Sequence, residues 1–119
     1  MNFKRLANRV IKRLNDEGVE CYLWHSANTG SAYIRFNDNR IGSIRLGDHK
    51  GRPKLSYRWN IRSDFPKGHN KWHKVNDKWR FYTHTSNWIE LIPHILERKT
   101  KTKGWVENKY TYFTPKYKR

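Results

Sequence analysis

A histidine beside an acid is the first arrangement in this sequence that could do chemistry. His49 follows Asp48 close to the end of a predicted strand, and a histidine in such a position can act as a general base. The same dipeptide also suits a turn in which the Asp48 carboxylate accepts hydrogen bonds from backbone N–H groups. The sequence leaves both interpretations of His49 open.

Two further histidines have a spacing that zinc sites use. His69 and His73 are separated by three residues. Additional ligands could come from Cys21, His25, His49 and His84. No C-x-x-C accompanies them, and the lysines around the histidine pair oppose a divalent cation. We therefore expect no metal and no cofactor, with His69 and His73 as the alternative metal ligands.

The short motifs of nucleotide hydrolysis, dinucleotide binding and zinc proteolysis are missing from the sequence. It contains no G-x-x-x-x-G-K-[ST], no G-x-G-x-x-G and no H-E-x-x-H. Its acidic residues are too few and too scattered to suggest a two-metal nuclease centre. We expect a protein that is not an enzyme and has no small-molecule substrate. The alternative is a small ribonuclease that uses His49.

Charge is the strongest functional signal. The 119 residues include 26 Lys and Arg against 10 Asp and Glu, a formal net charge of +16. Solubility alone needs a net charge of only about 2–8 in magnitude, whereas cations that neutralise phosphates gain affinity by releasing counterions. Basic residues also alternate with rings, as in Tyr57-Arg58-Trp59, a combination that suits nucleic acid. The expected partner is RNA or DNA.

The composition predicts one small folded domain. Only 35% of the residues are hydrophobic, but 15% are aromatic, which argues against disorder. No run of apolar residues is long enough to span a membrane, residues 1–14 lack the pattern of a signal peptide, and a single cysteine excludes an internal disulfide. We expect a cytoplasmic protein. Binding of the first helix to an anionic membrane surface is a further alternative.

Periodicity predicts an α+β fold. Apolar residues recur at helical spacing from Phe3 to Leu14, and Gly18 suits the left-handed position that ends a helix. Period-two patterns predict strands at 31–36, 41–46 and 55–62, and the aromatic-rich stretch 20–26 and residues 79–84 are further strand candidates. The first helix should cover the sheet face that carries Ile34, Phe36, Ile44, Leu46, Leu55, Tyr57, Trp59 and Ile61.

The remaining segments complete an antiparallel sheet of three to five strands with a second, short helix. We expect loops at 47–53 and 63–78, and a helix over 88–96 that Asn87 caps and Pro93 bends or breaks. Residues 1–100 would form the domain. Residues 101–119 would be a basic aromatic tail, or a final strand over 109–113.

The face opposite the first helix is the predicted binding surface. Its charged positions are all arginines, which grip phosphate with two hydrogen bonds and stack on bases, although a plain solvated face is also compatible with the pattern. Together with nearby loop residues, the expected nucleic-acid-binding set is Tyr33, Arg35, Arg45, Asp48, His49, Arg58, Arg62, Lys71 and Lys74.

The stretch 26–62 resembles a known pattern. Ser31-Ala32-Tyr33, followed by Ile44-Arg45-Leu46-Gly47-Asp48-His49, is similar to the Ser-x-Tyr and Ile-Arg-x-Ser-Asp-His sequences of small phage and prophage proteins, with Gly47 in place of Ser. Some of these are type II anti-CRISPR proteins, which inhibit a Cas effector. The resemblance implies a non-enzymatic phage protein, in the cytoplasm of a bacterial host cell, that binds an RNA-guided effector complex through its guide RNA or an acidic surface of the effector.

The predicted order of elements is similar to a second group of families. A helix, three antiparallel strands and a helix also make up the double-stranded-RNA-binding domain and the HicA-type toxin ribonucleases. In the toxins one histidine is catalytic, and His49 would be its counterpart here, although their Gly-Ser-His context is missing. Fold similarity alone does not set function.

Overall fold

The computed structural model describes residues 2–25, 30–59, 71–75 and 78–107. The elements in chain order are α1 (Phe3–Asp16), β1 (Cys21–His25), β2 (Ala32–Phe36), β3 (Ser43–His49), β4 (Arg52–Trp59), β5 (Trp72–Val75), β6 (Lys78–His84), the 3₁₀ helix η1 (Thr85–Glu90) and α2 (Leu91–Glu107). The predicted α+β class is confirmed.

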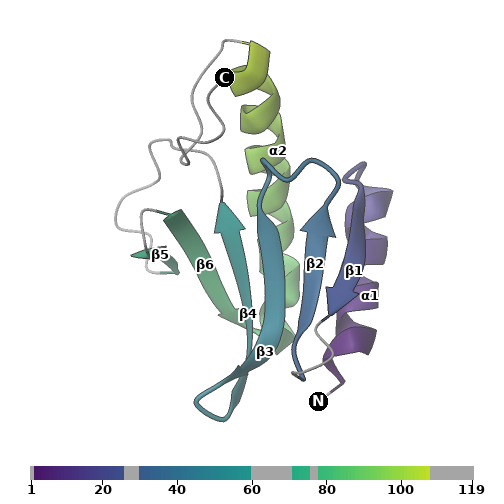
Figure 1. The fold of residues 1–119 in the computed structure, drawn as a ribbon, viewed down its shortest axis with the longest axis vertical. Coiled ribbons are helices and arrows are strands. Elements are labelled where there is room, and N and C mark those ends of the chain that lie inside the picture. Colours follow the sequence, from purple (N-terminus) through teal and green to yellow (C-terminus); the bar gives the residue numbers. More distant parts are fainter. Residues whose placement is uncertain (1, 26–29, 60–70, 76–77, 108–119) are drawn as a thin grey trace.

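The strands form one antiparallel sheet in the order β1-β2-β3-β4-β6-β5. Both α-helices of the described chain lie on the same side of this sheet (Figure 1). The sheet has six strands, more than expected, because Trp72–Val75 forms β5 inside a segment that we expected to be a loop. Trp72 is buried and pairs with Phe81, so the core recruits this short stretch.

Helix α1 forms as its periodicity predicts. The Asn2 side chain caps it by accepting a hydrogen bond of 3.0 Å from the Arg5 N–H group, and Gly18 follows its end with φ of +86°. The apolar stripe of Phe3, Ala7, Val10 and Leu14 is buried, and α1 contacts β1, β2 and β3. The stripe is therefore part of the protein core.

The connection between β3 and β4 is shorter than the predicted loop over 47–53. The strands pair up to His49 and Arg52, so the turn consists of Lys50 and Gly51, with φ of +54° and +77°. Two left-handed residues give the turn whose twist matches that of a tight hairpin. This turn aligns β3 and β4 over seven residue pairs.

The second helix begins later and is longer than predicted. His84 caps η1 by accepting a hydrogen bond from the Ser86 N–H group, and Asn87 marks a kink instead of a helix start. Pro93 lies in the first turn of the 17-residue helix α2, where its missing N–H group is not needed, so it does not break the helix. The boundary expected after residue 100 falls inside α2, and the predicted strand 109–113 lies outside the described residues.

The core combines apolar residues with a buried arginine. The expected core residues are buried, apart from Ile61, which lies outside the described part of the chain. Arg98 of α2 is only 1% exposed; its Cζ atom lies 5.6 Å from the Trp59 ring centroid and 5.3 Å from that of Trp72, and it pairs with Glu97. Arg98 thus joins α2 to β4 and β5.

Neither α1 nor the described part of α2 has the length and apolar character that crossing a bilayer requires.

Candidate nucleic-acid interface

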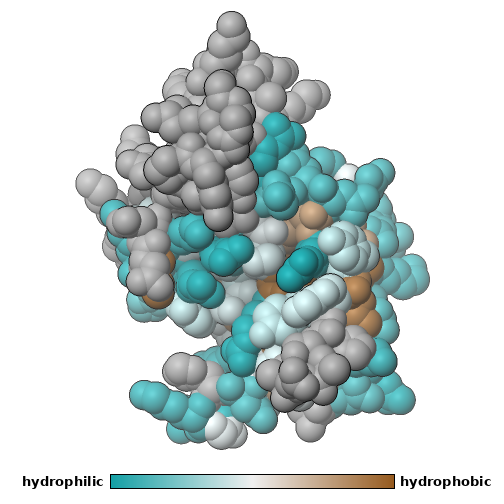
Figure 2. Space-filling view, in the orientation of Figure 1, coloured by the Kyte–Doolittle hydropathy of each residue, from teal (hydrophilic) through white to brown (hydrophobic). Residues whose placement is uncertain are grey.

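We call the side of the sheet that faces away from the helices the open face. Alternation along the paired strands assigns to it Tyr22, Trp24, Tyr33, Arg35, Ser43, Arg45, Gly47, Arg52, Lys54, Ser56, Arg58, His73, Val75, Lys78, Arg80, Tyr82 and His84, together with the backbone position of His49. Figure 2 views this face and shows strongly hydrophilic atoms next to atoms of intermediate hydropathy across it.

The register places the predicted arginines together. Tyr33 pairs with Arg45, and Ser43 pairs with Arg35 on one side and Arg58 on the other. The prediction that these three arginines share one face with Tyr33 is confirmed. Arg62, the fourth predicted arginine, lies outside the described residues.

Acidic residues are absent from the open-face positions of the described strands. In the six described strands, no open-face position is occupied by Asp or Glu. Several acids form ion pairs: Asp16 with Lys12, Glu17 with Arg13, Asp38 with Arg40, Glu90 with Lys71 and Glu97 with Arg98. No carboxylate of the described strands therefore neutralises the arginines of the open face, although the Glu20 carboxylate, before β1, lies beside Asn37 at its edge.

Aromatic rings stand next to the arginines. The Arg35 Cζ atom lies 4.2 Å from the centroid of the Trp24 ring, and the Trp24 and Tyr33 centroids are 5.1 Å apart in an edge-to-face arrangement. Trp24 remains 40% exposed and Tyr22 48% exposed. Farther along the sheet, the His73 and Tyr82 rings lie 5.7 Å apart.

The arginines differ in how they are held. Arg35 and Arg45 are exposed, and the Arg45 Nη2 atom donates a hydrogen bond of 3.0 Å to the Ser31 hydroxyl oxygen. Arg58 and Arg80 are half-buried and pair with each other across β4 and β6. Arg35 and Arg45 are thus open to an anionic ligand from solution.

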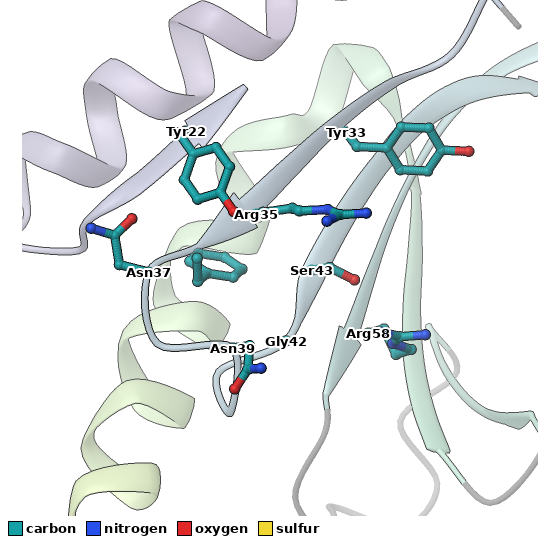
Figure 3. A pocket seen from close by; sticks show the side chains of 9 residues that line it. Tyr22, Tyr33, Arg35, Asn37, Asn39, Gly42, Ser43 and Arg58 are labelled. Carbon is teal, nitrogen blue, oxygen red and sulfur yellow. The ribbon is translucent and has the colours of Figure 1, made fainter. Parts of the chain in front are cut away.

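A hollow of about 480 Å³ opens on the β2–β3 part of the open face (Figure 3). Its lining residues are Tyr22, Tyr33, Arg35, Phe36, Asn37, Asn39, Gly42, Ser43 and Arg58. A Cβ atom on Gly42, whose φ is +124°, would collide with the carbonyl oxygen of Arg58. The loop after β2 therefore approaches β4 closely and closes one side of the hollow.

Other predicted binding residues lie elsewhere. Lys71 forms an ion pair of 2.7 Å with Glu90. Lys74 is exposed but pairs with Trp79 at a position that alternation assigns to the helix side. Asp48 is exposed near the end of β3, at a position that alternates with those of Arg45 and Gly47. These three residues do not join the arginines of the open face.

The histidine and cysteine candidates are not gathered into a site. His49 is the last residue of β3 and pairs with Arg52; its side chain, and His69, lie outside the described part of the structure. Among the described residues, no cluster of three or more His, Cys, Asp and Glu could hold a metal ion. Cys21 is half-buried, its thiol donates to the side-chain Oδ1 atom of Asn15 at 3.8 Å, and burial raises its pKa to about 11.

The open face includes residues that the sequence analysis did not assign to it, among them Tyr22, Trp24, Arg80 and Tyr82. The sequence predicted strands over 20–26 and 79–84 but no face for either strand. The alternation of Lys78, Arg80 and Tyr82 with the core residues of β6 carried the missing information. Assigning faces to the outer strands required knowledge of their neighbours.

No protein-family model, curated protein or solved structure matches this chain. Arginines can hold phosphates, and exposed rings can stack on bases.

Proposed function

We propose that the chain binds single-stranded nucleic acid on the open face of its sheet and catalyses no reaction. One observation carries the proposal: arginines and exposed rings share a face on which the described strands present no acid. Such a face attracts the phosphate backbone and also offers rings to the bases. A merely solvated face would not require exposed Tyr22 and Trp24.

The exposed rings favour a single strand over a duplex. Tyr22 and Trp24 project from a sheet, where they can stack on bases that are unpaired. Each stacked base contributes about 1–3 kcal/mol and shows little sequence preference. A duplex would meet the arginines through its phosphates and leave the rings unused.

Two narrower functions stay predictions from the sequence. Inhibition of an RNA-guided Cas effector depends on the resemblance around Ser31–Tyr33 and Ile44–His49. Ribonuclease activity depends on His49. Each has a direct test: inhibition of a purified effector by the protein, and cleavage of labelled RNA that disappears in His49→Ala.

Matched charge reversals test the proposed surface. Arg35→Glu combined with Arg45→Glu changes the net charge by the same amount as Lys4→Glu combined with Arg5→Glu on α1. Fluorescence anisotropy with a labelled single strand of 12 nucleotides should show an affinity loss of about 100-fold for the sheet pair and a much smaller loss for the helix pair. The sheet pair should also flatten the salt dependence by about 1.4 in log–log slope, because two phosphate contacts are removed.

Two outcomes would contradict the proposal. An equal or larger loss for the helix pair would place the ligand on the helix side. Equal affinity of the wild type for the single strand and for a duplex of the same length would show that the exposed rings do not stack on unpaired bases. Circular dichroism should show both double variants folded, since exposed substitutions usually change stability by about 0.5 kcal/mol or less.

A further inference from the structure

We infer that the hollow between Arg35 and Arg58 binds one unpaired nucleotide, with its phosphate beside the arginines and its base toward Asn37 and Asn39. This inference rests on the proposed function and assigns it a defined subsite. A volume of about 480 Å³ falls within the range of about 300–1,000 Å³ typical of small-molecule sites. Figure 3 shows the asparagines on one side of Ser43 and Arg58 on the other.

The hollow exists because a small residue separates two large cations. Ser43 pairs with Arg35 and with Arg58, and neighbouring strands lie about 4.8 Å apart. The backbones of the two arginines are therefore about 10 Å apart, with a serine side chain between them. Two arginine side chains that flank one small residue can approach a phosphate from two sides.

The asparagine side of the hollow is fixed by the chain segment before β1. The Asn37 N–H group donates to the Glu20 carbonyl oxygen at 3.0 Å, and its side-chain amide donates to a Glu20 carboxylate oxygen at 3.2 Å. Side-chain amides carry both donors and acceptors, as base edges do. The Glu20 carboxylate repels a phosphate from this side, so the nucleotide is oriented with its phosphate toward the arginines.

Two tyrosines complete the hollow. Tyr22 pairs with Arg35 across β1 and β2 and is 48% exposed. Tyr33 lies two residues before Arg35 on the same face and is half-buried against Trp24. The combination of ring, amide and paired guanidinium groups matches the three parts of a nucleotide that a protein can recognise: a flat base, its polar edge and a phosphate.

A substitution that fills the hollow without changing charge tests the inference. Ser43→Tyr places a ring between Arg35 and Arg58. Ser56→Tyr is the matched control, because Ser56 is also a half-buried serine on the open face but does not line the hollow. We expect Ser43→Tyr to weaken single-strand binding by at least about tenfold, the loss of one stacked base, with the salt slope of the wild type. Ser56→Tyr should change affinity by less than about threefold.

Mononucleotides identify the ligand of the hollow directly. Adenosine 5′-monophosphate should shift the backbone NMR signals of Arg35, Ser43 and Arg58 in the wild type and in Ser56→Tyr, but not in Ser43→Tyr. Adenosine alone or inorganic phosphate alone should give smaller shifts at the same concentration. Tyr22→Ala, which leaves the strands intact, should weaken the mononucleotide effect if Ser43→Tyr fails to fold.

The outcomes separate this inference from the proposed function. If Ser43→Tyr binds single strands as tightly as Ser56→Tyr while the arginine reversals still abolish binding, the hollow is not a subsite and the proposed function stands. Equal shifts with inorganic phosphate and with the mononucleotide would reduce the hollow to an anion site and overturn the inference. Absence of single-strand binding by the wild type would overturn the proposed function itself.

Discussion

The guanidinium group of Arg35 lies over the ring of Trp24, with its Cζ atom 4.2 Å from the ring centroid. At an exposed site such a cation–π contact contributes about 0.5–1 kcal/mol, less than a stacked base offers. The contact therefore holds Arg35 in an ordered position on the open face without binding it so strongly that a ligand cannot compete. It also makes Trp24 a spectroscopic reporter of anything that approaches Arg35.

The ring of Trp24 should contribute to binding without contributing charge. Trp24→Ala should weaken single-strand binding by about 5- to 150-fold, because one stacking contact of about 1–3 kcal/mol is lost. The slope of affinity against salt should not change, since the number of phosphate contacts is the same. Ile89→Ala, at a residue of η1 that is 49% exposed, should leave affinity unchanged. A flattened salt slope in Trp24→Ala would show that the ring acts by holding Arg35.

Gly42 should be required for the fold. Gly42→Ala should destabilise the protein by at least about 2 kcal/mol in urea denaturation, because its φ of +124° disfavours any side chain and its Cβ atom would collide with the Arg58 carbonyl oxygen. Gly30→Ala is the control, since a Cβ atom at Gly30 has no neighbour within 4 Å. Equal stability of the two variants would contradict the close approach of the loop to β4.

The Lys71–Glu90 pair should make the free energy of unfolding depend on pH in the acidic range. Burial alone would raise the pKa of Glu90, but hydrogen bonds from Lys71 and Thr83 and the charges of Lys71 and His94 outweigh it and lower the pKa. This stabilisation is complete above the unfolded-state pKa of about 4.3 and is lost as pH falls through the lower folded-state value. Glu90→Gln should therefore reduce stability at pH 7 and show a shallower decline toward about pH 3.

The same pair predicts a separation of stability from binding. Lys71→Ala should lower the free energy of unfolding at pH 7 while leaving single-strand affinity close to that of the wild type, because Lys71 interacts with Glu90. Asp38, whose pKa is lowered by Arg40 despite its burial, should preserve part of the acid sensitivity in Glu90→Gln. An affinity loss in Lys71→Ala as large as that in Arg35→Ala would show that Lys71 contacts the nucleic acid and would contradict this prediction.

Cys21 should be a slow nucleophile. Burial raises its pKa to about 11, against about 8.5 for a free thiol, so at neutral pH its thiolate fraction is about 300-fold lower. Its reaction with a thiol reagent should be slower by a similar factor in the folded protein than in urea. A folded-state rate equal to the unfolded one would show that Cys21 is fully exposed.

The elements with clean periodicity could be predicted from the sequence alone. The stripe from Phe3 to Leu14 forms α1, and the alternation in 55–59 places Tyr57 and Trp59 in the core. Because period-two alternation fixes the face of each residue, it also predicted that Arg35, Arg45 and Arg58 lie on one face of the sheet. These predictions succeeded since one pattern dominated each segment.

The remaining features depend on contacts between distant segments. Four residues of β5 carry too little pattern to signal a strand, and Trp72 becomes a core residue only through Phe81 and Tyr57. Arg98 continues the spacing of Leu91 and Ile95 along α2, but a charged residue conceals the stripe. The hollow beside Ser43 depends on the register of β3 with both neighbours, and the two-residue turn at Lys50 and Gly51 sets only the register with β4.

The two helices cover different halves of the sheet, and this division has a consequence for synthesis on the ribosome. Helix α1 contacts β1, β2 and β3, so the first half of the core can assemble while the rest of the chain is still being made. The side chains of Trp59 and Trp72 are covered by Arg98 of α2, a residue that is synthesised after both of them. The hydrogen bond from the Lys99 amine to the Gly18 carbonyl oxygen joins the two halves and can form only after Lys99 has been made. Until then the nascent chain exposes large aromatic residues of its second half, the stage at which chaperones would recognise it.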